Sequence, residues 1–148
     1  MNTLIIYQSI HHGNTEKIAK KMAEVLGADL KRPDEVKPDD LANYDLIGFG
    51  SGIYMWKFHQ SMLKFIDSLP SMPGKKAFTF FTCGAPFTFI YGKAESWKLG
   101  AKGFSLVGRF GCQGLDTYGP FKLIGGTGHG RPNDKDLAKA AAFAETLK

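Results

Sequence analysis

Residues 4–27, LIIYQSIHHGNTEKIAKKMAEVLG, decide the fold of this chain. Residues 4–7 form a continuous run of apolar, β-branched and aromatic side chains, typical of a strand buried on both faces of a parallel sheet. A polar loop follows. Residues 15–26 then place apolar side chains on one helical stripe and lysines elsewhere, and Gly27 stands just past the end. The stretch therefore predicts a strand, a loop and a helix, the first part of a βαβ unit.

The same alternation continues along the chain. It predicts further strands at residues 28–31, 44–50, 76–83 and 104–112. It predicts helices at residues 58–69 and 93–101, and a last helix that starts at Asn133 as N-cap and runs through Leu147. Strands that alternate with helices indicate right-handed βαβ crossovers and a parallel sheet covered on both faces. We therefore expect one α/β domain over residues 1–148.

Composition narrows the class of protein. The chain has 148 residues with 19 Lys+Arg against 14 Asp+Glu, a formal charge of +5, and 43% hydrophobic residues, which excludes intrinsic disorder. The basic residues form no dense tract and accompany no nucleic-acid-binding motif, so we expect no nucleic-acid partner. Two cysteines are too few for a disulfide scaffold, and no apolar stretch approaches the roughly 20 residues of a membrane span. We expect a soluble, unexported protein of the reducing cytoplasm.

The loop after the first strand has the features of an anion cradle. It contains Ser9, Ile10, His11, His12, Gly13, Asn14 and Thr15 and leads directly into a helix, whose first N–H groups are free to bind a phosphate. It is neither a Walker loop nor a G-x-G-x-x-G loop. The alternative is that Asn14 and Thr15 only cap the helix and Gly13 only makes the turn. Neighbouring histidines in a loop rarely direct both rings at one ion, so we expect no metal.

Three stretches resemble the flavodoxin family. Residues 5–22, IIYQSIHHGNTEKIAKKM, are similar to its phosphate signature, although three residues separate Ser9 from Gly13 where the shorter family version has two. Residues 48–66, GFGSGIYMWKFHQSMLKFI, look like its flavin-facing loop and helix, particularly in the branch related to HemG-type protoporphyrinogen oxidases. Residues 111–126, GCQGLDTYGPFKLIGG, look like the tail of that branch. The resemblance covers nearly the whole chain.

The resemblance implies a flavodoxin-like three-layer sandwich with a five-stranded parallel sheet in the order 2-1-3-4-5, and flavin mononucleotide (FMN) as cofactor. It implies that the phosphate is bound by residues 9–15. A flavin ring needs apolar or aromatic planes and backbone groups at its polar edge. The loops that offer them are Ser51, Gly52, Ile53, Tyr54, Met55 and Trp56, and Thr82, Cys83, Gly84, Ala85, Pro86 and Phe87, with Asp116, Thr117 and Tyr118 closing the site. Ordinary packing of the aromatic residues and turn formation at Asp116 are the alternatives.

The remaining cysteine and histidine residues have structural explanations. Cys83 and Cys112 end neighbouring predicted strands, so a redox dithiol is conceivable, but buried cysteines that act as small hydrophobic residues are far commoner. We expect His59 to cap or pack at a helix start and His129 to lie on the surface of a glycine-rich loop.

The resemblance to the flavodoxin family implies an FMN-binding electron carrier whose redox partner proteins dock transiently at the flavin edge. Such a carrier requires no catalytic residue. The flavin loops carry Lys57, His11 and His12 and only one carboxylate, Asp116, which predicts easier reduction than in acidic flavodoxins. The alternative is a HemG-like flavin oxidoreductase acting on a porphyrinogen or quinone, although the segment before the last helix is shorter than the HemG insert. A flavin-free interaction module on the same fold is the third possibility.

Overall fold

The computed structural model describes residues 1–10, 12–116 and 125–148. Its strands are β1 (Thr3–Gln8), β2 (Asp29–Lys31), β3 (Leu46–Tyr54), β4 (Lys57–Phe58), β5 (Lys76–Cys83) and β6 (Ser105–Gln113). Its helices are α1 (Asn14–Leu26), α2 (Gln60–Ser68), α3 (Lys93–Ala101) and α4 (Asp134–Glu145), with 3₁₀ turns at Pro33–Glu35, Pro38–Asn43 and Thr88–Ile90. The alternation of strands and helices expected from the sequence is confirmed.

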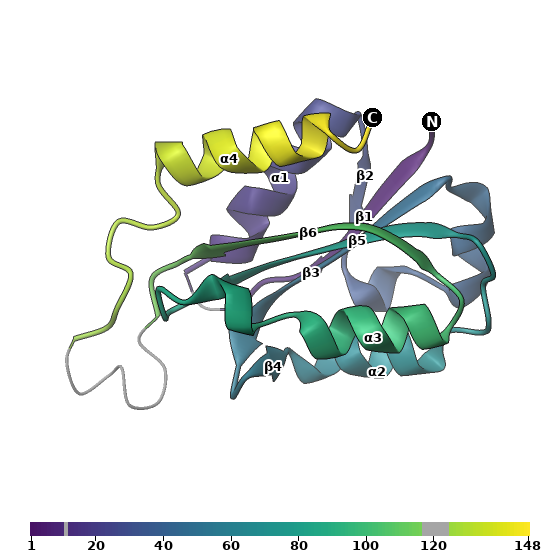
Figure 1. Ribbon diagram of the computed structural model, residues 1–148, viewed down its shortest axis with the longest axis horizontal. Coiled ribbons are helices and arrows are strands. Elements are labelled where there is room, and N and C mark those ends of the chain that lie inside the picture. The colour runs from purple at the N-terminus through teal and green to yellow at the C-terminus, as the bar shows by residue number, and fades with distance from the viewer. Residues whose placement is uncertain (11, 117–124) are drawn as a thin grey trace.

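The sheet has the strand order β2-β1-β3-β5-β6, with every neighbouring pair parallel. Helices α1 and α4 cover one face and α2 and α3 cover the other, so the molecule has three layers (Figure 1). The two-residue strand β4 lies off this path and pairs with β3 in antiparallel fashion. Counting only the five parallel strands, the order is the predicted 2-1-3-4-5.

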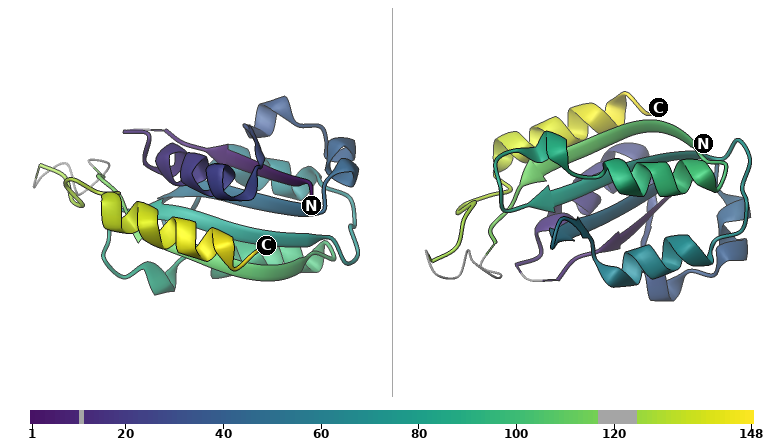
Figure 2. Two further views of the ribbon diagram at one scale, coloured as in Figure 1. Left: turned by 90° about the horizontal axis from the view of Figure 1, so that it is seen from above. Right: turned by 60° about the horizontal axis from the view of Figure 1, so that its bottom comes forward.

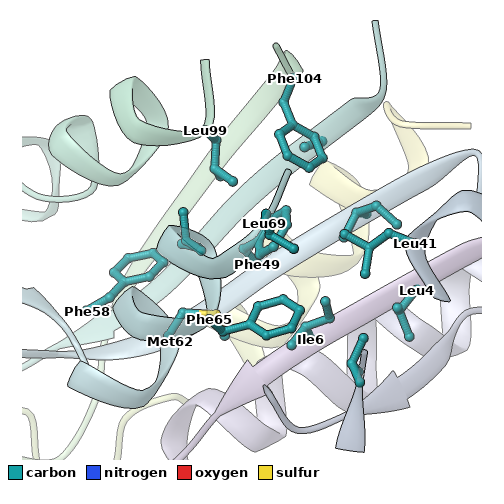
Figure 3. Packing of buried hydrophobic residues seen from close by; sticks show 14 of the residues in the cluster. Leu4, Ile6, Leu41, Phe49, Phe58, Met62, Phe65, Leu69, Leu99 and Phe104 are labelled. Atoms are coloured by element: carbon teal, nitrogen blue, oxygen red, sulfur yellow. The ribbon is translucent and has the colours of Figure 1, made fainter. Parts of the chain in front are cut away.

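Each face of the sheet has its own hydrophobic core. Helices α1 and α4 lie side by side over the first, which contains Ile5, Ile18, Met22 and Phe80 (Figure 2). Figure 3 shows the second core, built on the α2 and α3 side around residues that include Ile6, Leu41, Phe49, Phe58, Met62, Phe65, Leu99 and Phe104. The strands alternate their side chains between these cores, as the period of two requires.

Glycines in strands β3 and β6 make room for phenylalanine rings. A Cβ atom on Gly50 would overlap the ring of Phe80, and one on Gly111 would overlap the ring of Phe81. Both rings are essentially fully buried. Because each ring covers the neighbouring strand closely, an alanine at either glycine would force the sheet or the ring to move.

The structure corrects several predicted boundaries. Strand β3 continues past Gly50 to Tyr54, so residues 51–54 are the end of a strand rather than a loop. The continuation is stabilised by β4, through pairing of Ile53 with Phe58. Helix α2 begins at Gln60 because His59 is its N-cap, and α4 ends at Glu145 rather than at Leu147.

The last helix is fixed at its N-terminus by reciprocal hydrogen bonds. The Asn133 side chain accepts from the Asp136 N–H (3.0 Å), and the Asp136 carboxylate accepts from the Asn133 N–H (2.9 Å). The Asp136 carboxylate also pairs with Arg131, whose Nη2 donates to Oδ1 at 2.6 Å. The predicted N-cap at Asn133 is therefore confirmed, and Arg131 ties the preceding loop to it. Within the described part of the chain, the helices are all too short or too polar to cross a membrane.

Candidate functional site

A pocket lies where the carboxyl ends of β1, β3 and β5 meet the start of α1. It is lined by Ile10, Asn14, Thr15, Gly52, Ile53, Tyr54, Thr82, Cys83, Gly84, Leu115 and Asp116. These residues come from four loops or strand ends that are far apart in the sequence. In a parallel sheet the crevice between neighbouring strands with diverging connections is the usual ligand site.

The loop after β1 turns sharply into α1. Gly13 has φ +67° and precedes the first helical residue, Asn14. The hydroxyl of Ser9 accepts a hydrogen bond from the Glu16 N–H (3.2 Å), which ties the two ends of the loop together. Helix geometry leaves the N–H groups of the first turn without intrahelical acceptors. The positive end of α1 therefore faces the pocket with donors suited to an anion.

Two hydrogen bonds connect the start of α1 to the rest of the site. The hydroxyls of Thr15 and Thr82 lie 2.8 Å apart and both residues are buried, so α1 is joined to the end of β5. The side-chain amide of Asn14 donates to the carbonyl of Leu115 (2.7 Å). These contacts fix the spacing between the loop of residues 9–15 and the opposite wall of the pocket.

The β3–β4 hairpin forms one wall. The hydroxyl of Ser51 donates to the Gly52 carbonyl (2.7 Å) and accepts from the His59 N–H (2.9 Å). The buried carboxylate of Glu95 accepts from the Phe58 N–H (3.1 Å). The hairpin is therefore anchored at its base by both the start of α2 and helix α3.

Tyr54 lies at the mouth of the pocket. Its hydroxyl donates to the Ile10 carbonyl (3.3 Å), and its ring packs edge-on against His59 with centroids 5.3 Å apart. Burial is the main cause that raises the pKa of Tyr54; the Ile10 hydrogen bond lowers it and the charge of Asp116 raises it. The phenol therefore stays neutral through the physiological range and acts as a donor.

The loop after β5 forms the other wall. The carbonyl of Gly84 accepts from the Gln113 side-chain amide (2.7 Å) and from the Thr127 hydroxyl (3.2 Å). Asp116 exchanges two backbone hydrogen bonds with Thr127, both 2.8 Å long. A Cβ atom on Gly84 would lie 2.6 Å from the Cβ of Asp116, so only glycine fits here.

The tips of both walls are exposed and apolar. Met55 and Trp56 are 72% and 70% exposed, and both have positive φ, 49° and 72°. Phe87 is 60% exposed. The ring centroids of Trp56 and Tyr91 lie 5.7 Å apart, so the hairpin tip contacts the residue that follows the 3₁₀ turn after β5.

The two cysteines do not form a dithiol. Strands β5 and β6 pair Thr82 with Cys112, so the Cys83 side chain points to the opposite face of the sheet from that of Cys112. Cys83 belongs to the α2 and α3 core and Cys112 to the α1 and α4 core. Burial raises the pKa of each thiol to about 12. The redox dithiol considered from the sequence is therefore contradicted, and both cysteines act as buried packing residues.

The two predicted histidine roles have clear outcomes. The ring of His59 accepts from the Ser61 N–H (3.1 Å) and caps α2, as expected. His129 is exposed on the glycine-rich segment before α4, also as expected. His11, Thr117 and Tyr118 lie outside the described residues.

The sequence of the chain matches known flavodoxins. The family described as Flavodoxin domain matches residues 4–89. Flavodoxin 1 of Azotobacter vinelandii is 30% identical over 150 aligned positions, covering 91% of this chain and 86% of that protein. The chain belongs to the flavodoxin family. A protein of Methanocaldococcus jannaschii, named as the uncharacterized protein MJ0298, is 51% identical over 99% of this chain and 98% of its own length.

Solved flavodoxins share the fold. Oxidised Flavodoxin 2 of Bacillus cereus aligns with a TM-score of 0.76 at 21% identity, covering 99% of this chain and 97% of that one. A flavodoxin from the domain Archaea aligns with a TM-score of 0.74 at 20% identity, covering 99% and 96%. The resemblance to the flavodoxin family found in the sequence is confirmed, and the family implies a flavin cofactor.

The structure gathers part of the predicted flavodoxin site into the pocket itself. The predicted residues that line it are Ile10, Asn14, Thr15, Gly52, Ile53, Tyr54, Thr82, Cys83, Gly84 and Asp116. The others that are described lie beside it in the same loops: Ser9, His12, Gly13, Ser51, Met55, Trp56, Ala85, Pro86 and Phe87. Leu115 also lines the pocket and was missed. Its neighbours Gly114 and Asp116 were the only sequence signal for it.

Proposed function

We propose that this chain is a cytoplasmic flavodoxin that binds FMN in the pocket and carries electrons between proteins. The observation that supports the proposal most is the placement of the α1 N-terminus, with Gly13 at φ +67°, beside two walls in which glycines let Tyr54 and Asp116 approach the backbone closely. A Cβ atom on Gly52 would lie 3.0 Å from the Tyr54 hydroxyl, and Gly84 has no room for one at all. The residues present therefore fit a flat cofactor with a phosphate at one end.

The phosphate would be held by the loop of residues 9–15. Its donors would be the backbone N–H groups at the start of α1 other than that of Glu16, which donates to Ser9, and the Ser9 hydroxyl, with His11 and His12 in the same loop. Charge-assisted hydrogen bonds of this kind are about twice as strong as neutral ones. The loop orients the cofactor by its charged end.

The ring would lie between residues 51–56 and residues 82–87, with Asp116 behind it. Tyr54 and Trp56 offer aromatic planes, and the backbone of Gly84 faces the pocket. Bound FMN supplies reversible transfer of one or two electrons, and the protein sets its potential and its access.

The exposed tips at Met55, Trp56 and Phe87 favour a carrier over an enzyme with an enclosed substrate site. A carrier needs a cofactor edge that another protein can approach, and it needs no acid, base or nucleophile. Partner proteins would therefore dock transiently at this edge.

Anaerobic reduction tests the proposal. The purified protein, loaded with FMN, is mixed with NADPH with and without a flavodoxin reductase, and the flavin absorbance is followed. We expect reduction only when the reductase is present, and reoxidation by a second redox protein. Multiple turnovers of a quinone or protoporphyrinogen by the protein alone would contradict a carrier and favour the HemG-like alternative.

A further inference from the structure

The largest group of exposed apolar side chains in the described parts of the chain lies on two segments that continue from the pocket walls. It consists of Met55, Trp56, Phe87, Phe89 and Ile90, which are 72%, 70%, 60%, 67% and 43% exposed. We name these five residues the apolar rim. They come from only two segments, the β3–β4 hairpin tip and the loop after β5, and the Trp56–Tyr91 contact joins the segments into one surface. Clustered apolar side chains at a rim mark a protein interaction site.

Positive charges flank the apolar rim. Lys57 follows Trp56, and Lys93 begins α3 two residues after Tyr91. The Arg109 side chain lies against the same corner, because a Cβ atom on Gly92 would meet its Cδ at 3.2 Å. All three residues are exposed, and none forms an ion pair with a carboxylate of residues 1–10, 12–116 or 125–148.

Carboxylates near this corner point inward. Glu95 is 2% exposed and accepts the Phe58 N–H, and Asp116 lines the pocket below the rim. Some exposed carboxylates, such as Asp29 and Asp45, lie at the amino end of the sheet. There Tyr44 donates to Asp29 (2.7 Å), and the charges of Asp29 and Asp40 raise its pKa further. The exposed charges that flank the apolar rim in the described residues are therefore those of Lys57, Lys93 and Arg109.

We propose that the apolar rim docks a redox protein whose own apolar contact surface is bordered by carboxylates. The inference rests on the proposed function, since the rim continues from the two segments that line the proposed FMN pocket. Cations without partners attract an acidic surface, and the apolar side chains supply the contact area. A second copy of this chain would bring like charges together, which disfavours self-association.

Electron transfer to two probe proteins of opposite charge tests the inference. The FMN-loaded, reduced protein is mixed in a stopped-flow instrument with an acidic rubredoxin or with a basic cytochrome c, and each iron gains one electron from the protein. We expect the second-order rate constant with rubredoxin to fall as salt is raised, and the rate constant with cytochrome c to rise. The opposite pair of salt dependences would overturn the proposal.

Matched variants locate the effect. Lys57→Glu with Lys93→Glu should lower the rate constant with rubredoxin about tenfold at low salt. Lys37→Glu with Lys76→Glu makes the same change of charge at exposed positions near the amino end of the sheet and should leave it within about twofold. Phe89→Ser should also slow the reaction, whereas Val107→Ser, at another exposed apolar residue, should not. Equal effects of variant and control would contradict docking at the rim.

The same study also tests two other occupants of the apolar rim, a second copy of this chain and an anionic membrane surface. Sedimentation as a dimer that Phe89→Ser abolishes, or binding to anionic phosphatidylglycerol vesicles that Lys57→Glu with Lys93→Glu abolishes, would each overturn the inference. Flavin absorbance is recorded before mixing, so the two proposals fail separately. A protein that binds no FMN contradicts the proposed function. A protein that binds FMN and is reduced by an added reductant, but transfers electrons faster to cytochrome c, contradicts only the acidic partner.

Discussion

The hydroxyls of Thr15 and Thr82 lie 2.8 Å apart in a buried contact that joins the first turn of α1 to the end of β5. One hydroxyl donates to the other, and each residue also lines the pocket. The contact therefore couples the proposed phosphate end of the site to the proposed ring end.

We expect Thr82→Val to lower the free energy of unfolding of the apoprotein by about 1–3 kcal/mol, because the Thr15 hydroxyl is left buried without its partner. Thr15→Val with Thr82→Val should cost less than the sum of the single variants, since no hydroxyl then remains unpaired. Urea unfolding of the four proteins measures the coupling. Strictly additive losses would show that the two hydroxyls stabilise the fold independently.

The two cysteines should be unreactive in the folded protein. Burial raises the pKa of both thiols to about 12, so the thiolate is scarce at pH 8. Iodoacetamide should modify both thiols in urea and neither in buffer. Rapid labelling of Cys83 or Cys112 in the native state would contradict the burial that we describe.

The same thiols make stability depend on pH in the alkaline range. Their pKa rises from an ordinary value of 9.0 to about 12 on folding, so their contribution is complete below pH 9 and is lost progressively between pH 9 and 12. Each thiol should contribute a loss of about 1.4 kcal/mol between pH 8 and pH 10. Cys83→Ala with Cys112→Ala should reduce the loss of unfolding free energy between pH 8 and pH 10 relative to the wild type. An unchanged loss would show that the two thiols do not cause it.

The Arg131–Asp136 pair should stabilise α4 and the loop before it. Burial favours the neutral acid at Asp136, but the hydrogen bonds from Arg131 and Asn133 outweigh it and lower its pKa below the ordinary 3.8. Its contribution is therefore present above that value and is lost as pH falls through the lower folded pKa. Asp136→Asn should lower the free energy of unfolding at pH 7 by about 2 kcal/mol.

An exposed ion pair provides the control for Asp136→Asn. Glu24 pairs with Lys21 at 3.1 Å on the surface of α1, where its side chain is 71% exposed. Glu24→Gln should change the free energy of unfolding by less than about 0.5 kcal/mol. If the two variants lose the same free energy of unfolding in thermal or urea unfolding, the Arg131–Asp136 pair stabilises the protein no more than an exposed ion pair does.

The potential of the bound flavin should respond to Asp116. This carboxylate lines the pocket, and it opposes the charge gained on reduction. A single charge at roughly 8 Å in an effective dielectric of about 20 contributes about 2 kcal/mol, or roughly 90 mV per electron, as an upper value. Asp116→Asn should raise the midpoint potential by tens of millivolts, to about this limit. Asp34→Asn, at an exposed site in the first 3₁₀ turn, should leave the potential unchanged in the same potentiometric titration.

The sequence predicted most elements because apolar periodicity is local, whereas the sheet order was predicted by the resemblance to the flavodoxin family. The bounds of β5 and α3 agree residue for residue with those expected. It did not predict that β3 runs on to Tyr54, because that extension depends on antiparallel pairing with Phe58 across a turn. Nor could spacing alone place Cys83 and Cys112 on opposite faces, since this depends on the register between β5 and β6. Leu115 was missed because a lone leucine between turn residues carries no periodic signal.

Comparative titration with FMN and riboflavin tests the account most directly. The two ligands differ only by the phosphate, so the loop of residues 9–15 should favour FMN about a hundredfold. Gly13→Asp, which places a carboxylate at the proposed phosphate site, should abolish that preference. Gly27→Asp adds the same side chain at the other end of α1, also at positive φ (61°), and should keep it. Equal affinity of the wild-type protein for both ligands, or equal losses in the two variants, would contradict an FMN site in this pocket.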